Sequence, residues 1–257
     1  MKNLTALFVL TSLLVCAAQA EEIKKAGPEI KPAVGKTGKV SVPAKPAGKE
    51  LTAAAGESEE AKLEKAVIAG LKDWDSKLLT LRTRFTQEVD FSEAGLKQHI
   101  EGVLSYMKPD LLKIEHIKPA RQLVYTDKKE LWVYKPEDSQ AVRTSWDAWK
   151  KNQSGNFSGI MDFGNYAALT ERNDMKVARS ASAAYITVVL TKKNNPDLYT
   201  LTLALSSTDY FPVEAALTID KTTIKTRLEN PEINTVLDKA LFEFVPPKGT
   251  EVLEFNN

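Results

Sequence analysis

The chain has 257 residues, of which 43% are hydrophobic, and it carries 35 Lys and Arg against 34 Asp and Glu. This apolar fraction is ordinary for a protein that buries a core, so the composition excludes a wholly disordered or collagen-like chain. The near-neutral charge lacks the excess of cations on which non-specific nucleic-acid binding depends. We therefore expect no nucleic-acid partner.

Residues 1–20 have the pattern of a secretory signal peptide. Lys2 gives a positive start, residues 4–16 form an uncharged run, and Ala18 and Ala20 place small residues at a cleavage site. The run is shorter than the roughly 20 apolar residues that span a membrane. We expect a cleaved signal, a periplasmic protein, and loss of Cys16, which is the only cysteine.

Residues 21–58 differ from the rest of the chain in composition. They are rich in Pro, Gly and Lys and contain no aromatic residue. Such a segment cannot bury enough apolar surface to offset its conformational entropy. We interpret it as a disordered tether that precedes a folded domain at residues 59–257.

The folded domain is expected to begin with a helix. Ser58, followed by Glu59 and Glu60, suits a helix N-terminus because it combines a capping residue with acids in the first turn. Beyond them, apolar residues recur at helical spacing: Leu63, Val67, Leu71, Trp74 and Leu78. The pattern predicts one amphipathic helix that runs to about Leu81.

After Thr83 the apolar period changes to two, which is typical of half-buried strands. Turn signals separate short segments of this kind, and we predict strands around 85–91, 102–106, 112–116, 122–126, 130–134, 140–144, 175–179, 184–192, 199–206, 212–219, 222–228 and 242–245. This succession predicts a mainly β fold in which one antiparallel sheet curls towards a barrel.

Residues 145–173 interrupt the strands. The segment is too irregular for a strand and too rich in Trp, Phe, Ile and Met for a solvated loop. Long loops inside a compact domain are usually lids or binding loops. We predict short helices that cover the sheet.

Catalytic and metal-binding motifs are missing from the sequence. His99 and His116 fall on separate predicted strands without ligand spacing, so we interpret them as ordinary sheet histidines. No nucleophile elbow, phosphate loop or dinucleotide fingerprint is present. We expect no enzyme, cofactor or metal. Because the concave side of a curled apolar sheet must be filled by a core, a helix or a ligand, a lidded hydrophobic cavity is favoured.

Several segments in order resemble the periplasmic lipoprotein-carrier family, LolA. They are residues 85–87, 102–104, 108–112, 119–127, 131–136 and 140, and the closing segment 242–252, which is similar to that family's FxFxPPxGxxV signature. The resemblance covers about residues 59–253. It implies an unclosed β-barrel of about eleven antiparallel strands with helices that close its mouth.

The resemblance also implies a function and its residues. Such proteins accept an acylated lipoprotein from an inner-membrane ABC transporter complex and pass it to an outer-membrane acceptor, without catalysis; we expect a monomer. The family's Arg that hydrogen-bonds the lid corresponds to Lys108, and because Lys has a single ammonium we expect this contact to be looser or differently partnered. We predict cavity residues Phe85, Leu104, Tyr106, Leu112, Ile114 and Trp132, and lid residues Trp74, Lys108, Met161 and Phe163. A bulge would reverse which face each strand residue occupies.

Two other functions fit the same fold. The protein could carry another amphiphile, such as a glycolipid or a pigment lipid, because cavity residues alone do not distinguish the guest. Related lidded half-barrels also serve as envelope-stress sensors or scaffolds, usually with a second domain after the barrel. The sequence ends at Asn257 without one, which favours carriage in this interpretation.

Overall fold

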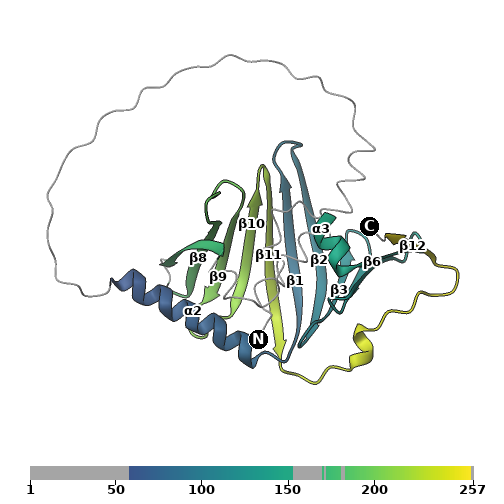
Figure 1. The fold of residues 1–257 in the computed structure, drawn as a ribbon, viewed down its shortest axis with the longest axis horizontal. Helices are drawn as coiled ribbons and strands as arrows, with labels where there is room; N and C mark the ends of the chain where they lie inside the picture. The colour runs from purple at the N-terminus through teal and green to yellow at the C-terminus, as the bar shows by residue number, and fades with distance from the viewer. Residues whose placement is uncertain (1–57, 153–169, 171, 181–182, 256–257) are drawn as a thin grey trace, which may run out of the picture.

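The computed structural model describes residues 58–152, 170, 172–180 and 183–255. The predicted signal peptide and residues 21–57 of the predicted tether lie outside this range. Figure 1 shows a single curved sheet with helix α2 across one end of its strands and the short helix α3 at the other half of the sheet.

Helix α2 (Glu59–Lys77) begins as the sequence predicts. The hydroxyl of Ser58 accepts a hydrogen bond from the backbone N–H of Ala61 at 3.1 Å, and two acids occupy the first turn. The predicted end at Leu81 is wrong: the helix stops at Lys77, and β1 begins at Thr80. Alternating burial takes over there and places Leu81 in the core as a strand residue.

The described chain contains twelve strands in one sheet. Their bounds are β1 (Thr80–Phe91), β2 (Leu96–Met107), β3 (Leu111–Lys118), β4 (Gln122–Thr126), β5 (Glu130–Lys135), β6 (Gln140–Ser145), β7 (Asn173–Arg179), β8 (Tyr185–Lys192), β9 (Thr200–Ser206), β10 (Pro212–Ile219), β11 (Thr222–Ile233) and β12 (Glu251–Phe255). The predicted positions of the first eleven strands are confirmed, although β1 begins five residues earlier, β2 begins six residues earlier and β11 continues five residues further than expected.

The strand order is β12-β6-β5-β4-β3-β2-β1-β11-β10-β9-β8-β7. Every neighbouring pair is antiparallel except β12 and β6, which are parallel. Strands β12 and β7 stand at opposite edges and are not paired with each other, so the sheet is unclosed. This confirms the predicted open, mainly antiparallel β fold.

The predicted strand at 242–245 is wrong. Lys239–Phe242 form a short 3-10 helix, and the chain pairs with the sheet again only at β12. Two prolines, Pro246 and Pro247, follow this segment and lack the backbone N–H that a sheet ladder requires. The alternating Phe242 and Phe244 therefore serve packing rather than strand pairing.

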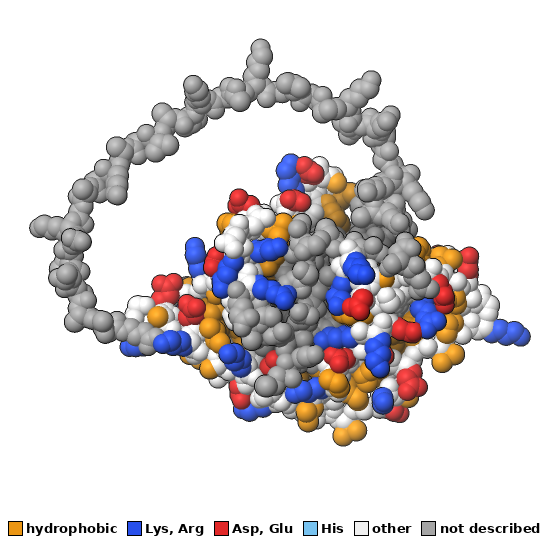
Figure 2. All heavy atoms as spheres, viewed as in Figure 1, with side chains coloured by type: hydrophobic (Ala, Val, Ile, Leu, Met, Phe, Trp, Pro, Cys, Tyr) orange, Lys and Arg blue, Asp and Glu red, His pale blue; other side chains and the backbone are white. Residues whose placement is uncertain are grey.

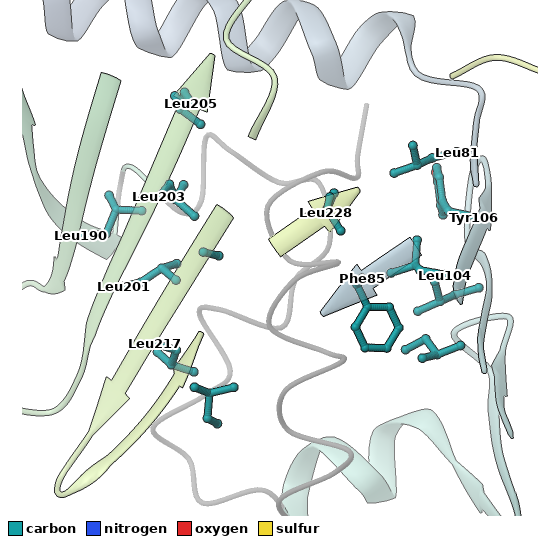
Figure 3. Packing of buried hydrophobic residues seen from close by; sticks show 14 of the residues in the cluster. Leu81, Phe85, Leu104, Tyr106, Leu190, Leu201, Leu203, Leu205, Leu217 and Leu228 are labelled. Atoms are coloured by element: carbon teal, nitrogen blue, oxygen red, sulfur yellow. The ribbon is translucent and has the colours of Figure 1, made fainter. Parts of the chain in front are cut away.

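One hydrophobic cluster connects the two halves of the sheet. It contains side chains from β1 to β5, from β7 to β11, and from both helices. In Figure 3, Leu81, Phe85 and Leu104 point towards the side where leucines of β8 to β10 lie. We call this inner side of the curved sheet the concave face, and the opposite side the convex face.

Helix α2 is held close to the turn between β9 and β10. A Cβ atom on Gly70 would lie 2.4 Å from the ring of Tyr210, so only glycine permits this approach. Trp74 meets Phe211 edge-on, with ring centroids 5.3 Å apart. The helix therefore covers one end of the concave face.

Candidate functional site: the concave face

Five of the six predicted cavity residues lie together on the concave face. Phe85, Leu104, Tyr106, Leu112 and Ile114 are each at most 2% exposed and belong to the single hydrophobic cluster. The register explains their meeting, because Leu104 pairs with Ile114 and Tyr106 pairs with Leu112 across β2 and β3. The alternation of these strands places the five residues on one face, and their role in lining a cavity stays a prediction.

The prediction that Trp132 joins them is wrong. Its neighbours on β5, Leu131 and Val133, contact the core cluster, so the pleat turns Trp132 to the convex face. There the indole contacts Phe244, with centroids 5.4 Å apart, and the guanidinium of Arg143 lies over it. The large apolar side chain of Trp132 suggested a cavity position. Its place in the alternation of β5 instead puts it on the convex face.

The far half of the concave face was not named from sequence. It is formed by apolar residues of β8, β9 and β10 that point towards the β1 and β2 side chains (Figure 3): Leu190, Leu201, Leu203, Leu205 and Leu217. All five are at most 2% exposed. Their signal was present in the strict alternation of residues 199–206, which predicted a strand but not the face that it shares with Phe85.

Lys108 fastens the loop between β2 and β3 to the end of helix α2. Its ammonium donates hydrogen bonds to the backbone carbonyls of Asp75 and Ser76, each at 3.2 Å. A cation at a helix C-terminus satisfies carbonyls that have no partner within the helix. The contact predicted for Lys108 is therefore made to α2, within the described part of the chain.

Trp74 lies on helix α2 and faces the sheet. Its indole N–H donates to the carbonyl of Asp209, and its ring packs against the core cluster. Together with Lys108, it joins α2 to two different loops at one end of the concave face. The predicted lid residues Met161 and Phe163 lie outside the described residues.

The start of the predicted helical insertion is described. Helix α3 (Trp146–Asn152) follows β6 directly, and the hydroxyl of Ser145 accepts from the N–H of Ala148 at 3.1 Å. Trp146 and Trp149 stack at 4.9 Å and are part of the hydrophobic cluster. This portion confirms a helix at that position.

Two buried ionisable side chains have shifted pKa values on this face. Burial, with further contributions from Asp110 and Asp75, raises the pKa of the Tyr106 phenol, which donates to the carbonyl of Pro109 at 3.1 Å. Burial lowers the pKa of His116 to about 4, so its imidazole is neutral near pH 7. The interpretation of His116 as an ordinary sheet histidine does not account for its 3% exposure next to Phe85.

Asp75 is the only Asp, Glu, Lys or Arg that is buried among the described residues. Lys, Arg, Asp and Glu are interspersed over the described part of the face seen in Figure 2. In that same part of the chain, no group of three or more His, Cys, Asp or Glu side chains is placed to hold a metal ion. Among the described helices, none combines the length and the apolarity needed to cross a bilayer.

Comparison with known proteins places this fold in a family. The model of the family described as "Outer membrane lipoprotein carrier protein LolA" matches residues 76–245. An outer-membrane lipoprotein carrier protein of Dechloromonas aromatica is 27% identical over 184 residues, which cover 71% of this chain and 85% of that protein. One from Neisseria meningitidis is 24% identical over 195 residues, covering 75% and 89%.

One solved structure aligns with most of this chain. The crystal structure of a LolA superfamily protein from Nitrosomonas europaea aligns with a TM-score of 0.40 and 12% identity, over 70% of this chain and 97% of that one.

Proposed function

The chain belongs to the LolA family of outer membrane lipoprotein carriers, and from this premise we propose that it is a periplasmic carrier that holds the acyl chains of a lipoprotein on its concave face. It would receive the lipoprotein from an inner-membrane ABC transporter complex and deliver it to an outer-membrane acceptor. Carriage of this kind needs no catalytic group.

The mostly apolar concave face, whose hydrophobic side chains form one cluster, is the observation that supports acyl binding most strongly. Side chains from both halves of an open sheet converge on it, and Asp75 is the only Asp, Glu, Lys or Arg among the buried side chains that the structure describes. Each methylene removed from water contributes about 0.8 kcal/mol, so enclosing a sixteen-carbon chain would contribute about 12 kcal/mol before ordering costs. An uncharged face of this kind suits a hydrocarbon guest.

Release must be possible as well as binding. Three fully enclosed chains would dissociate too slowly for a carrier, so a sheet that stays open at its edges and exposes part of each chain is better suited. Helix α2 packs Val67 and Leu71 into the hydrophobic cluster and is held at its C-terminal end by Lys108 and Trp74.

Photocrosslinking from matched positions tests the proposal. We would place p-azidophenylalanine at Phe85, on the concave face, or at Phe244, on the convex face, and irradiate cells that express each variant. We expect acylated lipoproteins to be linked at position 85 and not at position 244. Equal yields from both positions, or links at position 85 only to proteins without acyl chains, would contradict lipoprotein carriage.

A further inference from the structure

Among the polar side chains on the concave face, three have a buried nitrogen without a hydrogen-bond partner in the described part of the chain. Gln87 of β1 is fully buried, His116 of β3 is 3% exposed, and Gln122 of β4 is partly buried. The Nε2 atom of each is buried and has no hydrogen-bond partner in the described part of the chain. Only the other end of the Gln87 amide is engaged, because its Oε1 accepts from the hydroxyl of Thr226 at 3.3 Å.

The sheet register relates His116 and Gln122 to the ring of Phe85. Gln122 is directly opposite His116, and His116 is opposite Gly102. Gly102 in turn pairs with Phe85, whose ring lies over it: a Cβ on Gly102 would lie 2.5 Å from Cζ of Phe85. The same ring meets the imidazole of His116 edge-on at 5.8 Å.

Gln87 completes the arrangement from the neighbouring position on β1. It stands two residues after Phe85, so the pleat gives it the same face. Gln87 and His116 therefore lie beside Phe85 on the concave face, and Gln122 of β4 lies next to His116. This arrangement is a cluster of polar atoms inside the proposed acyl-binding surface.

Leaving such groups without partners has a cost. A buried polar group without a hydrogen bond destabilises a fold, and folded proteins contain only a few. The amide nitrogens of Gln87 and Gln122 can only donate, so their missing partner must be an acceptor. The only buried Asp, Glu, Lys or Arg that the structure describes is Asp75, which lies at the end of α2 and is an acid. The cluster therefore has no buried Lys or Arg with which to hold a phosphate or a carboxylate.

We propose that Gln87, His116 and Gln122 donate hydrogen bonds to the ester carbonyls of an acylated glycerol whose hydrocarbon chains lie on the concave face. This inference rests on the proposed function and specifies the part of the guest that is recognised. Ester carbonyls are neutral acceptors attached directly to acyl chains, so they match both the donors and the apolar surroundings. The cluster fixes how deeply the glycerol enters, while the apolar residues hold the chains.

The test compares two ligands that differ only in their carbonyls. Dipalmitoylglycerol carries two ester carbonyls, and dihexadecylglycerol replaces them by ether linkages. We expect the wild-type protein to bind the ester about 25-fold more tightly, because it carries two ester carbonyls and each neutral hydrogen bond contributes roughly a factor of five to affinity. Displacement of a fluorescent fatty acid measures both affinities on the full chain.

Near-isosteric variants remove the donors one at a time. Gln87→Met, His116→Phe and Gln122→Met should each reduce the ester preference several-fold while the affinity for the ether stays within a factor of two. Gln140→Met is the matched control, because it makes the same substitution on β6, at a glutamine outside this cluster whose amide nitrogen donates to Glu251 at 3.2 Å. It should leave the ester preference unchanged.

The outcomes separate this inference from the proposed function. Equal binding of ester and ether by the wild-type protein, or an ester preference unchanged in all three variants, would overturn the donor assignment but leave acyl carriage standing. Failure of both ligands to bind would overturn carriage as well.

Lipoproteins and free phospholipids both carry this ester group. Diester and diether forms of a diacylglyceryl lipopeptide and of phosphatidylglycerol identify the source. An ester preference with the lipopeptide alone points to a lipoprotein, and one with phosphatidylglycerol points to a free lipid. Either result supports the donors.

Discussion

The two faces of strands β3 to β5 carry very different chemistry, although they are built from alternating residues of the same strands. On the convex face, the ring of Phe244 contacts three aromatic side chains at 5.1 to 5.4 Å, those of Tyr125, Trp132 and Tyr134. Lys113 and Arg143 lie over two of these rings. On the concave face, the same strands present Leu112, Ile114 and His116.

The two faces differ in whether other parts of the described chain cover and hydrogen-bond their side chains. The convex aromatic cluster is completed by the protein's own C-terminal segment, which brings Phe244 and then β12 to the sheet. The concave face retains polar nitrogens without partners among the described residues. A fold that satisfies one face internally and leaves the other incomplete is suited to receive a guest on the incomplete face.

The largest expected effect compares a phenylalanine from each face. Phe85→Ala should lower the free energy of unfolding by about 3–5 kcal/mol, because it empties a fully buried site. Phe244→Ala should cost about 1–2 kcal/mol, since that ring is only partly buried. Urea denaturation of both variants measures the difference, and equal losses would show that the two faces are equivalent in stability.

The second expected effect is on the pH dependence of stability. The pKa of His116 is lowered to about 4 in the folded protein, against about 6.5 when unfolded, so the unfolded state binds the extra proton between these values. Stability due to the neutral imidazole is complete above pH 6.5 and is lost as the pH falls towards 4, by about 1.4 kcal/mol per pH unit.

Replacing the imidazole of His116 should reduce this dependence of the free energy of unfolding on pH. Denaturation of His116→Phe from pH 6.5 to 5 should show a shallower loss of stability than the wild-type protein. His99→Gln, at an exposed histidine on β2, is the control and should keep the wild-type slope. A slope unchanged in His116→Phe would mean that this histidine is not the titrating group.

The third effect concerns the attachment of α2. Lys108→Met removes two hydrogen bonds to helix carbonyls and should destabilise the protein by about 1 kcal/mol. Amide hydrogen exchange should increase at the end of α2 nearest Ser76. Lys72→Met, at an exposed lysine of the same helix, should change neither quantity; equal effects of both substitutions would contradict the specific role of Lys108.

The smallest effect is expected at Arg143 on the convex face. Its guanidinium forms ion pairs with Glu130 and Glu254 and so connects β5, β6 and β12. Exposed ion pairs contribute little to global stability. Arg143→Met should therefore increase hydrogen exchange in β12 without a measurable change in melting temperature, and a large drop in melting temperature would show that the convex ion pairs support the core.

Period and turn chemistry were enough to predict most of the sheet. The alternation in β1 to β3 located Phe85, Leu104 and Ile114 on one face, and the cap at Ser58 located the start of α2. Trp132 could not be placed in this way, because strand parity must be known to the residue.

Other features depend on contacts that are distant in sequence. β12 pairs in parallel with β6, more than a hundred residues earlier, and no local pattern encodes that pairing. The unpartnered nitrogen of His116 likewise emerges only when β2, β3 and β4 are assembled.

Native mass spectrometry of the protein, purified gently from the cells that produce it, tests the central claim most directly. If the concave face holds acyl chains, a fraction of the protein should carry the added mass of an acylated protein, and excess diacylglyceryl lipopeptide should displace it. A bare chain whose mass is unchanged by excess lipopeptide would contradict the claim.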